Sequence, residues 1–118
     1  MSNHSCIREG DLMGDELLEL KAEVLKALGQ PTRLKILELL RNGERCVCEI
    51  FPAIQEEQSN VSRHLALMKG AGILVSRKQG QMVHYRVRDP KVFELLDGVN
   101  ALLKTHIEER KTLSRRLG

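Results

Sequence analysis

Along the first third of the chain, apolar residues recur three or four positions apart, which predicts two helices. The first begins at Asp15, a helix-capping residue type, and Gly29 ends it. Its apolar residues are Leu17, Leu20, Val24 and Leu28. The second begins at Pro31, which suits a first turn, and stops at the pair Asn42-Gly43. Its apolar residues are Leu34, Ile36, Leu37, Leu39 and Leu40.

The middle of the chain carries the same helical period in two shorter pieces. A short helix is expected over roughly Cys48–Ile54, followed by a polar turn at Gln55–Ser59. A longer helix is expected over about Gln58–Lys69, with Gly70 and Gly72 closing it. Its inward face consists of Val61, Leu65 and Met68.

The period then changes to that of strands. Ile73–Lys78 and Met82–Val87 read as two strands joined by the turn Gln79–Gln81, and Asp89-Pro90 ends the second. A last amphipathic helix follows. Its apolar residues are Phe93, Leu96, Val99, Leu103 and Ile107.

The order helix, helix, short helix, helix, hairpin, helix predicts a winged helix-turn-helix. The fold class is α+β and mostly α, with a two-stranded β-hairpin as the wing. We expect residues 1–14 to be a flexible tail and residues 15–113 to be one domain. The chain has no Trp and only three other aromatic residues, so its core is a thin aliphatic one. A thin core favours a homodimer, formed here through the terminal helices.

The charge of the chain is divided unevenly. The net charge is −4 over residues 1–57 and +7 over residues 58–118. Between Gln58 and Arg88 there is no Asp or Glu at all, although that stretch holds six Lys and Arg residues. A basic surface without carboxylates suits a polyanion, because each carboxylate would repel phosphate.

The candidate DNA-binding residues lie on the fourth predicted helix and on the hairpin. Asn and Gln can pair with adenine edges, Arg with guanine, and Ser with phosphate. The helix candidates are Gln58, Ser59, Asn60, Ser62, Arg63 and His64. The wing candidates, expected at flanking phosphates or in the minor groove, are Arg77, Lys78, Gln79 and Gln81. The alternative interpretation is a solvated helix with capping Ser and Asn residues.

Three separated segments, covering about residues 20–90, resemble the ArsR/SmtB metalloregulatory repressors. Gln58–Met68 looks like that family's recognition helix, Arg77–Arg86 like its wing, and Gly29–Leu37 like the segment before the motif. The resemblance implies a homodimeric repressor that binds double-stranded operator DNA and leaves it when an inducer binds. It implies no cofactor for folding.

Two of the three cysteines form the sequence Cys46-Val47-Cys48. Thiolates select soft ions. On an intact helix, residues i and i+2 point about 200° apart, so they can share an ion only at a helix end or after unwinding. Glu44–Ile50 is similar to the Cys-Val-Cys inducer site of the arsenic- and cadmium-sensing members. The alternative is that both cysteines are small buried hydrophobic residues.

The third ligand decides which inducer is expected. The arsenic sensors most similar to this sequence have a cysteine where this chain has Phe51, which leaves Cys6 as the third thiol. Three thiolates suit pyramidal As(III) or Sb(III), the inducers we expect. Cd(II), Pb(II) or Zn(II), with His4 as a fourth ligand, is one alternative. A thiol redox sensor that oxidises Cys46 or Cys48 is another.

Other classes of function find less support in the sequence. The family's second zinc site is only half matched, by His106 and Glu109, because Phe93 and Leu95 occupy its first half. No nucleophile–base set or phosphate loop indicates an enzyme. The sequence has no apolar run of membrane-spanning length and no secretory signal, so a cytoplasmic protein is expected.

Overall fold

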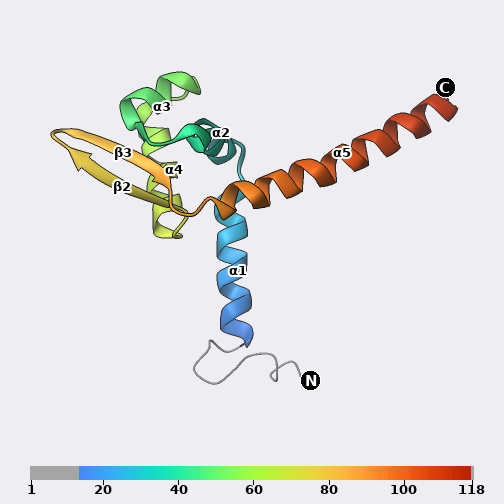
Figure 1. The fold of residues 1–118 in the computed structure, drawn as a ribbon, viewed down its shortest axis with the longest axis horizontal. Helices are drawn as coiled ribbons and strands as arrows, with labels where there is room; N and C mark the ends of the chain where they lie inside the picture. The colour runs from blue at the N-terminus through green and yellow to red at the C-terminus, as the bar shows by residue number, and fades with distance from the viewer. Residues whose placement is uncertain (1–13, 118) are drawn as a thin grey trace. The chain divides into compact units, whose positions relative to one another are not determined.

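The computed structural model describes residues 14–117, which form two compact units divided after Arg88 (Figure 1). The helices of the first unit are α1 (Gly14–Leu28), α2 (Pro31–Leu39), the 3-10 turn η2 (Leu40–Asn42), α3 (Val47–Ala53) and α4 (Gln58–Gly70). Its strands are β1 (Arg45–Cys46), β2 (Leu74–Gln79) and β3 (Met82–Val87). The second unit contains α5 (Lys91–Leu117). Among residues 14–117, none of the helices combines the length and the hydropathy of a membrane span.

The core of the first unit lies where α2, α3 and α4 meet the base of the sheet. Its fully buried side chains are Ile36, Leu37, Leu40, Ile50, Val61, Leu65, Met68 and Leu74. The predicted inward face of the fourth helix is confirmed, because Val61, Leu65 and Met68 are all fully buried in α4. This burial fixes which face of α4 remains at the surface.

The local sequence explains where these helices begin. Gln30 caps α2, since its side-chain Oε1 accepts a hydrogen bond from the Arg33 amide at 2.9 Å, and Pro31 fits the first turn. Between α3 and α4 the chain turns through Gln55, whose φ is +58°. The helix pair α3–α4 and the β2–β3 hairpin form a winged helix-turn-helix, which confirms the fold predicted from the sequence.

The sheet corrects one detail of the prediction. It has three strands in the order β1-β3-β2, whereas only a two-stranded hairpin was expected. Strand β1 pairs antiparallel with β3, with Arg45 opposite Tyr85 and Cys46 opposite His84. Two residues are too short to show the alternation that predicts a strand. Strand β1 therefore connects the segment just before α3 to the wing by pairing with β3.

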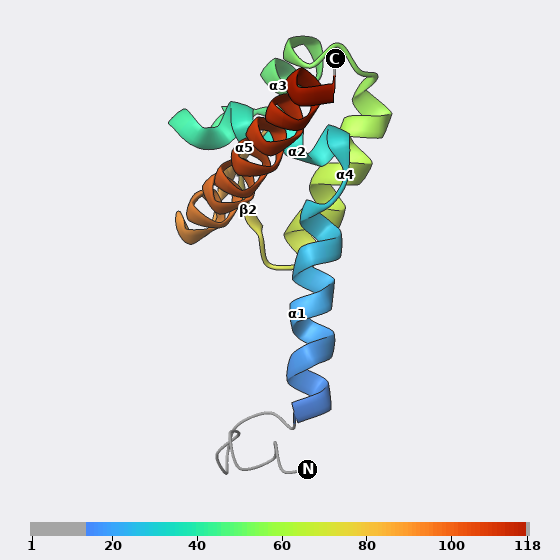
Figure 2. The same cartoon turned by 90° about the vertical axis from the view of Figure 1, so that its right-hand side faces the viewer.

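Both terminal helices expose much of their apolar surface. In α1, Ala27 and Leu28 are buried, and Figure 2 shows the N-terminal turns of this helix running on past the end of α4. The exposed apolar residues of α1 include Leu18, Leu20 and Leu25, and those of α5 include Val99, Leu102, Leu103 and Ile107. The last helix is longer than its apolar pattern indicated and reaches Leu117. The predicted flexible tail lies outside the described residues, except for Gly14, which begins α1.

Candidate DNA-binding face and thiol pair

The N-terminal half of α4 presents the polar residues that the sequence assigned to DNA. Gln58, Ser59, Ser62 and Arg63 are exposed, and Asn60 is half-buried. Gln58 and Ser62 are four residues apart, as are Ser59 and Arg63, so these pairs share one side of the helix. A helix N-terminus also carries free backbone N–H groups that favour phosphate. The placement fits a recognition helix that enters the major groove.

A chain of hydrogen bonds holds Arg63 in place. Arg63 Nη2 donates to Asn60 Oδ1 at 2.6 Å, and Asn60 Nδ2 donates to Glu56 Oε1 at 2.6 Å. Thr32 Oγ1 in turn donates to Glu56 Oε2 at 3.2 Å. Because both ends of the Asn60 amide are engaged, Asn60 acts here as a support for Arg63. Glu56 was not identified from the sequence, because it lies outside the acid-free stretch.

His64 does not lie on this exposed face, which corrects the expectation that it stands at the surface of α4. Its side chain is buried, and its Nδ1 lies 3.4 Å from Arg33 Nη1. His64 follows Val61 by three residues and precedes Met68 by four, so it belongs to the buried stripe of α4. That spacing was visible in the sequence. Burial first, and then the charges of Arg33 and Arg63, lower the pKa of His64 below its ordinary value.

The lowered pKa of His64 predicts a pH-dependent stability. Between that pKa and about 6.5, the unfolded chain binds more protons at this position than the folded chain. The free energy of unfolding should therefore decrease as the pH falls below about 6.5. Urea denaturation of the parent and of His64→Gln across this range measures the effect. The parent should lose more stability than the variant, and parallel curves would contradict the prediction.

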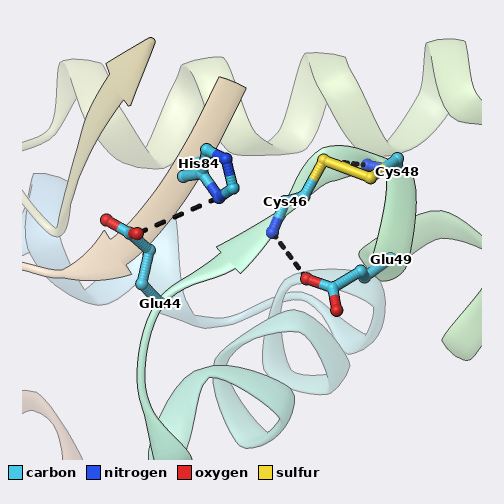
Figure 3. The surroundings of a disulfide bond; sticks show 5 residues. All are labelled: Glu44, Cys46, Cys48, Glu49 and His84. Carbon is cyan, nitrogen blue, oxygen red and sulfur yellow. Dashed lines mark hydrogen bonds and ion pairs between the residues drawn. A yellow bond between two sulfur atoms is a disulfide. The ribbon is translucent and has the colours of Figure 1, made fainter. Parts of the chain in front are cut away.

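The wing carries its basic residues at the surface, but one of them, Arg77, forms an ion pair with a carboxylate. Arg77 donates to Glu44 from Nε at 2.9 and 2.8 Å and from Nη2 at 2.7 Å. The hydrogen bond from Arg77 is the main cause of a Glu44 pKa below its ordinary value. The Glu44–Arg77 ion pair therefore breaks only when the pH falls through that lowered pKa and Glu44 is protonated. His84 Nδ1 lies 3.9 Å from the same carboxylate (Figure 3). No local pattern indicated Glu44, which is 33 residues from Arg77.

This pairing predicts opposite effects of two charge changes. Within residues 14–117 no carboxylate pairs with Lys78, so Lys78→Ala should flatten the salt dependence of DNA binding by about 0.9 in log–log slope per lost phosphate contact. Glu44→Gln releases Arg77 and should steepen that slope by a similar amount. Arg77→Ala should weaken DNA binding less than Lys78→Ala does.

Fluorescence anisotropy of labelled promoter DNA at several salt concentrations measures all three variants. Equal losses for Lys78→Ala and Arg77→Ala would show that Arg77 leaves Glu44 when DNA binds. An unchanged salt dependence for both Lys78→Ala and Arg77→Ala would show that the wing does not contact DNA phosphates.

The two cysteines lie at the junction of β1 and α3. Cys46 is the last residue of β1 and the N-cap of α3, and it is buried; Cys48 is exposed in the first turn of α3. The backbone N–H of Cys46 donates to Glu49 Oε1 at 3.0 Å, and the backbone N–H of Cys48 donates to Cys46 Sγ at 3.1 Å. Figure 3 shows Glu49 turned back toward Cys46 in this capping arrangement.

Cys46 and Cys48 are joined by a disulfide, whereas the sequence favoured reduced thiols and offered oxidation of either cysteine only as an alternative (Figure 3). Their Cα atoms are 5.1 Å apart. Because Cys46 precedes the helix, the i,i+2 spacing brings both sulfur atoms to the same place without unwinding α3. A helix end was one of the two conditions that the spacing required. Reduction would leave two thiols side by side.

The rest of the expected ligand set is not brought together in the described chain. Cys6 lies outside the described residues. Within residues 14–117 no cluster of three or more His, Cys, Asp or Glu side chains could hold a metal ion. His106 and Glu109 are both exposed on α5.

A groove of about 250 Å³ opens beside the cysteines. Four elements line it: the end of β1, the start of α3, the exposed side of α4 and the wing. The lining residues are Cys46, Val47, Cys48, Gln58, Ser62, Gln81, Met82, Val83 and Tyr85. Thiols and candidate DNA-reading residues therefore share one surface depression.

Comparison with known proteins identifies this arrangement. Residues 30–76 match the family described as "Bacterial regulatory protein, arsR family". An uncharacterised helix-turn-helix transcriptional regulator of Methanocaldococcus jannaschii is 43% identical over 88 residues, which cover 74% of this chain and 99% of that protein. The arsenical resistance operon repressor of Escherichia coli is 46% identical over 69 residues, which cover 58% of this chain and 59% of that protein.

A solved structure shows the same fold. It is the homodimeric winged helix-turn-helix DNA-binding domain of a possible ArsR-family regulator from Mycobacterium bovis. Its TM-score is 0.73 and its sequence identity is 34%, with 80% of this chain and 88% of that chain covered.

Proposed function

This chain belongs to the arsR family of bacterial regulatory proteins, and we propose that it is a homodimeric repressor induced by As(III) or Sb(III). Its relatives and its fold are those of DNA-binding transcriptional regulators and not of enzymes. The observation that carries the proposal is the position of Cys46 and Cys48. Their sulfur atoms meet at the start of α3, beside the groove that α4 and the wing also line.

The donor set favours As(III) or Sb(III) as the inducer. The reduced pair supplies two soft ligands, and Cys6 supplies the third that a pyramidal ion takes. The similarity to the arsenical resistance operon repressor of Escherichia coli supports the same class of inducer. Tetrahedral Zn(II) or Cd(II) takes four ligands, and for these ions His4 is the fourth donor that the sequence offers.

The sheet suggests how inducer binding reaches the DNA-binding face. Cys46 pairs with His84 of β3, and Glu44, two residues before Cys46, holds Arg77 of β2. A shift of Cys46 would therefore move the β3 strand and the Glu44–Arg77 pair together. We therefore propose that an ion bound at the thiols favours a second arrangement of β1 and the wing, one with lower affinity for DNA.

Titration of the reduced protein, bound to its own promoter DNA, with As(III), Cd(II) and Zn(II) tests the proposal. As(III) should release the DNA at the lowest concentration. Release by Cd(II) or Zn(II) but not by As(III) would show that a divalent ion is the inducer. The proposal that the protein is a metal-responsive repressor would then still hold. Retention of DNA in all three titrations would contradict metalloregulation.

A second candidate function is thiol redox sensing, which the Cys46–Cys48 disulfide itself favours. Forming that bond removes two electrons and two protons from the pair of thiols. Because the disulfide ties the last residue of β1 to the first turn of α3, oxidation acts on the same element as an ion would. DNA affinity of the oxidised and reduced protein, compared without any metal, separates this candidate from the first.

The exposed apolar faces of the terminal helices predict the dimer contact. Leu20 and Val24 of α1, and Val99 and Leu103 of α5, are all exposed on the single chain. Dimeric helix-turn-helix proteins read two half-sites, so a two-fold axis is expected. Sedimentation should show a dimer at micromolar concentration, and Leu103→Glu should shift it toward monomer. Lys104→Glu is the matched control, because it introduces a glutamate next to Leu103 without removing an apolar side chain. A monomeric parent, with and without DNA, would reject the expectation.

A further inference from the structure

Glu56 is an acid at the edge of the face that is expected to meet DNA. It lies four residues before Asn60, and it directly precedes Glu57, the N-cap of α4. A carboxylate in this place repels DNA phosphates, so its charge lowers the affinity for DNA of every sequence. The bonds that Glu56 makes point to a role that offsets this repulsion.

Hydrogen bonds to two other helices hold Glu56 in place. Its backbone N–H donates to the carbonyl oxygen of Phe51 in α3 at 3.1 Å. Its Oε2 accepts from Thr32 Oγ1 at 3.2 Å, and Thr32 is buried at the start of α2, with 7% of its surface exposed. The half-buried carboxylate of Glu56 is therefore fixed relative to the core of the first unit.

The charge of Glu56 determines which end of the Asn60 amide faces Arg63. An ionised carboxylate only accepts hydrogen bonds, so it takes Asn60 Nδ2 as its donor, at 2.6 Å. Asn60 Oδ1 then points the other way and accepts from Arg63 Nη2 at 2.6 Å. A neutral amide at position 56 donates as well as accepts, so it would also permit the reversed Asn60 amide. Reversed, Asn60 turns a donor toward a guanidinium that has only donors.

Without this support the Arg63 side chain has room to move. It is exposed, and it borders an open depression of about 590 Å³ that Glu56, Glu57, Ser59 and Asn60 also line. A mobile arginine can pair with the phosphates of any DNA sequence. An arginine oriented in advance loses less conformational entropy at its own base and adapts poorly to a different one.

We propose that Glu56 is a positioning residue for DNA sequence specificity, which acts through Asn60 to orient Arg63 toward one base. This inference rests on the expected contact between Arg63 and a base. It makes Thr32 the anchor of the arrangement, so that α2 contributes to the reading of DNA sequence without contacting the base.

The specificity ratio tests the proposal. This ratio is the affinity for the protein's own promoter DNA divided by that for unrelated DNA of the same length, measured by fluorescence anisotropy at one salt concentration. Glu56→Gln should lower the ratio about three- to tenfold, the range expected for ordering one long side chain. Glu57→Gln is the matched control, because exposed Glu57 carries the same charge and makes no side-chain capping bond. It should raise both affinities by a similar factor and keep the ratio within about twofold of the parent's. A parental ratio in Glu56→Gln would overturn the proposal.

Combining Glu56→Gln with Arg63→Ala shows whether Glu56 acts through Arg63. Once Arg63 is absent, Glu56→Gln should lower the ratio no further. A further decrease of the same size would overturn the proposal, because Glu56 would then act by another route. If Arg63→Ala alone leaves the ratio unchanged, the expected base contact and this inference both fail, while the proposed repressor function stands.

Two substitutions of Thr32 test the anchor and leave the charge of Glu56 in place. Thr32→Val has nearly the shape of threonine but no hydroxyl, so it should lower the specificity ratio as Glu56→Gln does. Thr32→Ser keeps the hydroxyl that donates to Glu56 and should retain the parent's ratio. Equal ratios in the two variants would overturn the anchoring by α2. This pair also tests the proposal if Glu56→Gln fails to fold.

Discussion

Cys46→Ser and Cys48→Ser should each abolish release from promoter DNA by As(III) while leaving DNA binding without As(III) unchanged. Each variant removes one of the two soft donors that meet at the start of α3. The concentration needed for release should rise by at least about 100-fold, equivalent to about 2.7 kcal/mol. Serine preserves the fold at Cys46, because it is a strong N-cap residue and the Glu49 bond goes to the backbone.

Promoter release, followed by fluorescence anisotropy on the reduced proteins, measures this prediction. Val47→Ala is the matched control, because it alters the residue between the cysteines and keeps both thiols. It should respond to As(III) as the parent does. A normal response from Cys46→Ser would place the inducer site elsewhere, with His106 and Glu109 of α5 as the next residues to test.

Arg63→Ala should cost about 1–3 kcal/mol of specific DNA binding, the range of one good bidentate contact to a base. Arg63 is exposed near the start of α4, and Asn60 holds its guanidinium in place. A side chain oriented in advance loses less conformational entropy when it meets a base. The loss should therefore be larger on the operator than on unrelated DNA of the same length.

Lys69→Ala controls for charge. Lys69 is exposed and basic and lies in the last turn of the same helix. It is far from the N-terminal end of α4, which is expected to enter the major groove of DNA. It should lower affinity for the operator and for unrelated DNA equally and by a small amount. If Arg63→Ala behaves like Lys69→Ala, then Arg63 contacts phosphate and the base-reading residues are others on α4.

Most of the fold followed from the spacing of apolar residues. Val61, Leu65 and Met68 fixed the buried face of α4, and the change to alternating spacing after Ile73 marked the wing. The same rule would have placed His64 inside, since it lies three residues after Val61. Its grouping with the polar helix start led instead to the expectation that it is exposed.

Features that depend on residues distant in sequence were not predictable in this way. The strand β1 is two residues long, and its partner on β3 is about 40 positions away. The Glu44–Arg77 pair spans 33 positions, so nothing near Arg77 showed that its charge is compensated. For the cysteines, spacing alone required a helix end or an unwound helix, and the structure selects the helix end. The disulfide was not the favoured state, because a cytoplasmic protein was expected and disulfides are rare in the cytosol.

As(III) is expected to bind this repressor through cysteine thiolates as the repressor leaves the DNA. X-ray absorption at the arsenic edge, on the reduced protein after release from its promoter by As(III), tests this most directly. In the parent we expect arsenic bound by sulfur alone, through three As–S bonds from Cys46, Cys48 and Cys6. In Cys6→Ser we expect two As–S bonds and one oxygen ligand. Arsenic surrounded by oxygen or nitrogen in the released parent protein would contradict it.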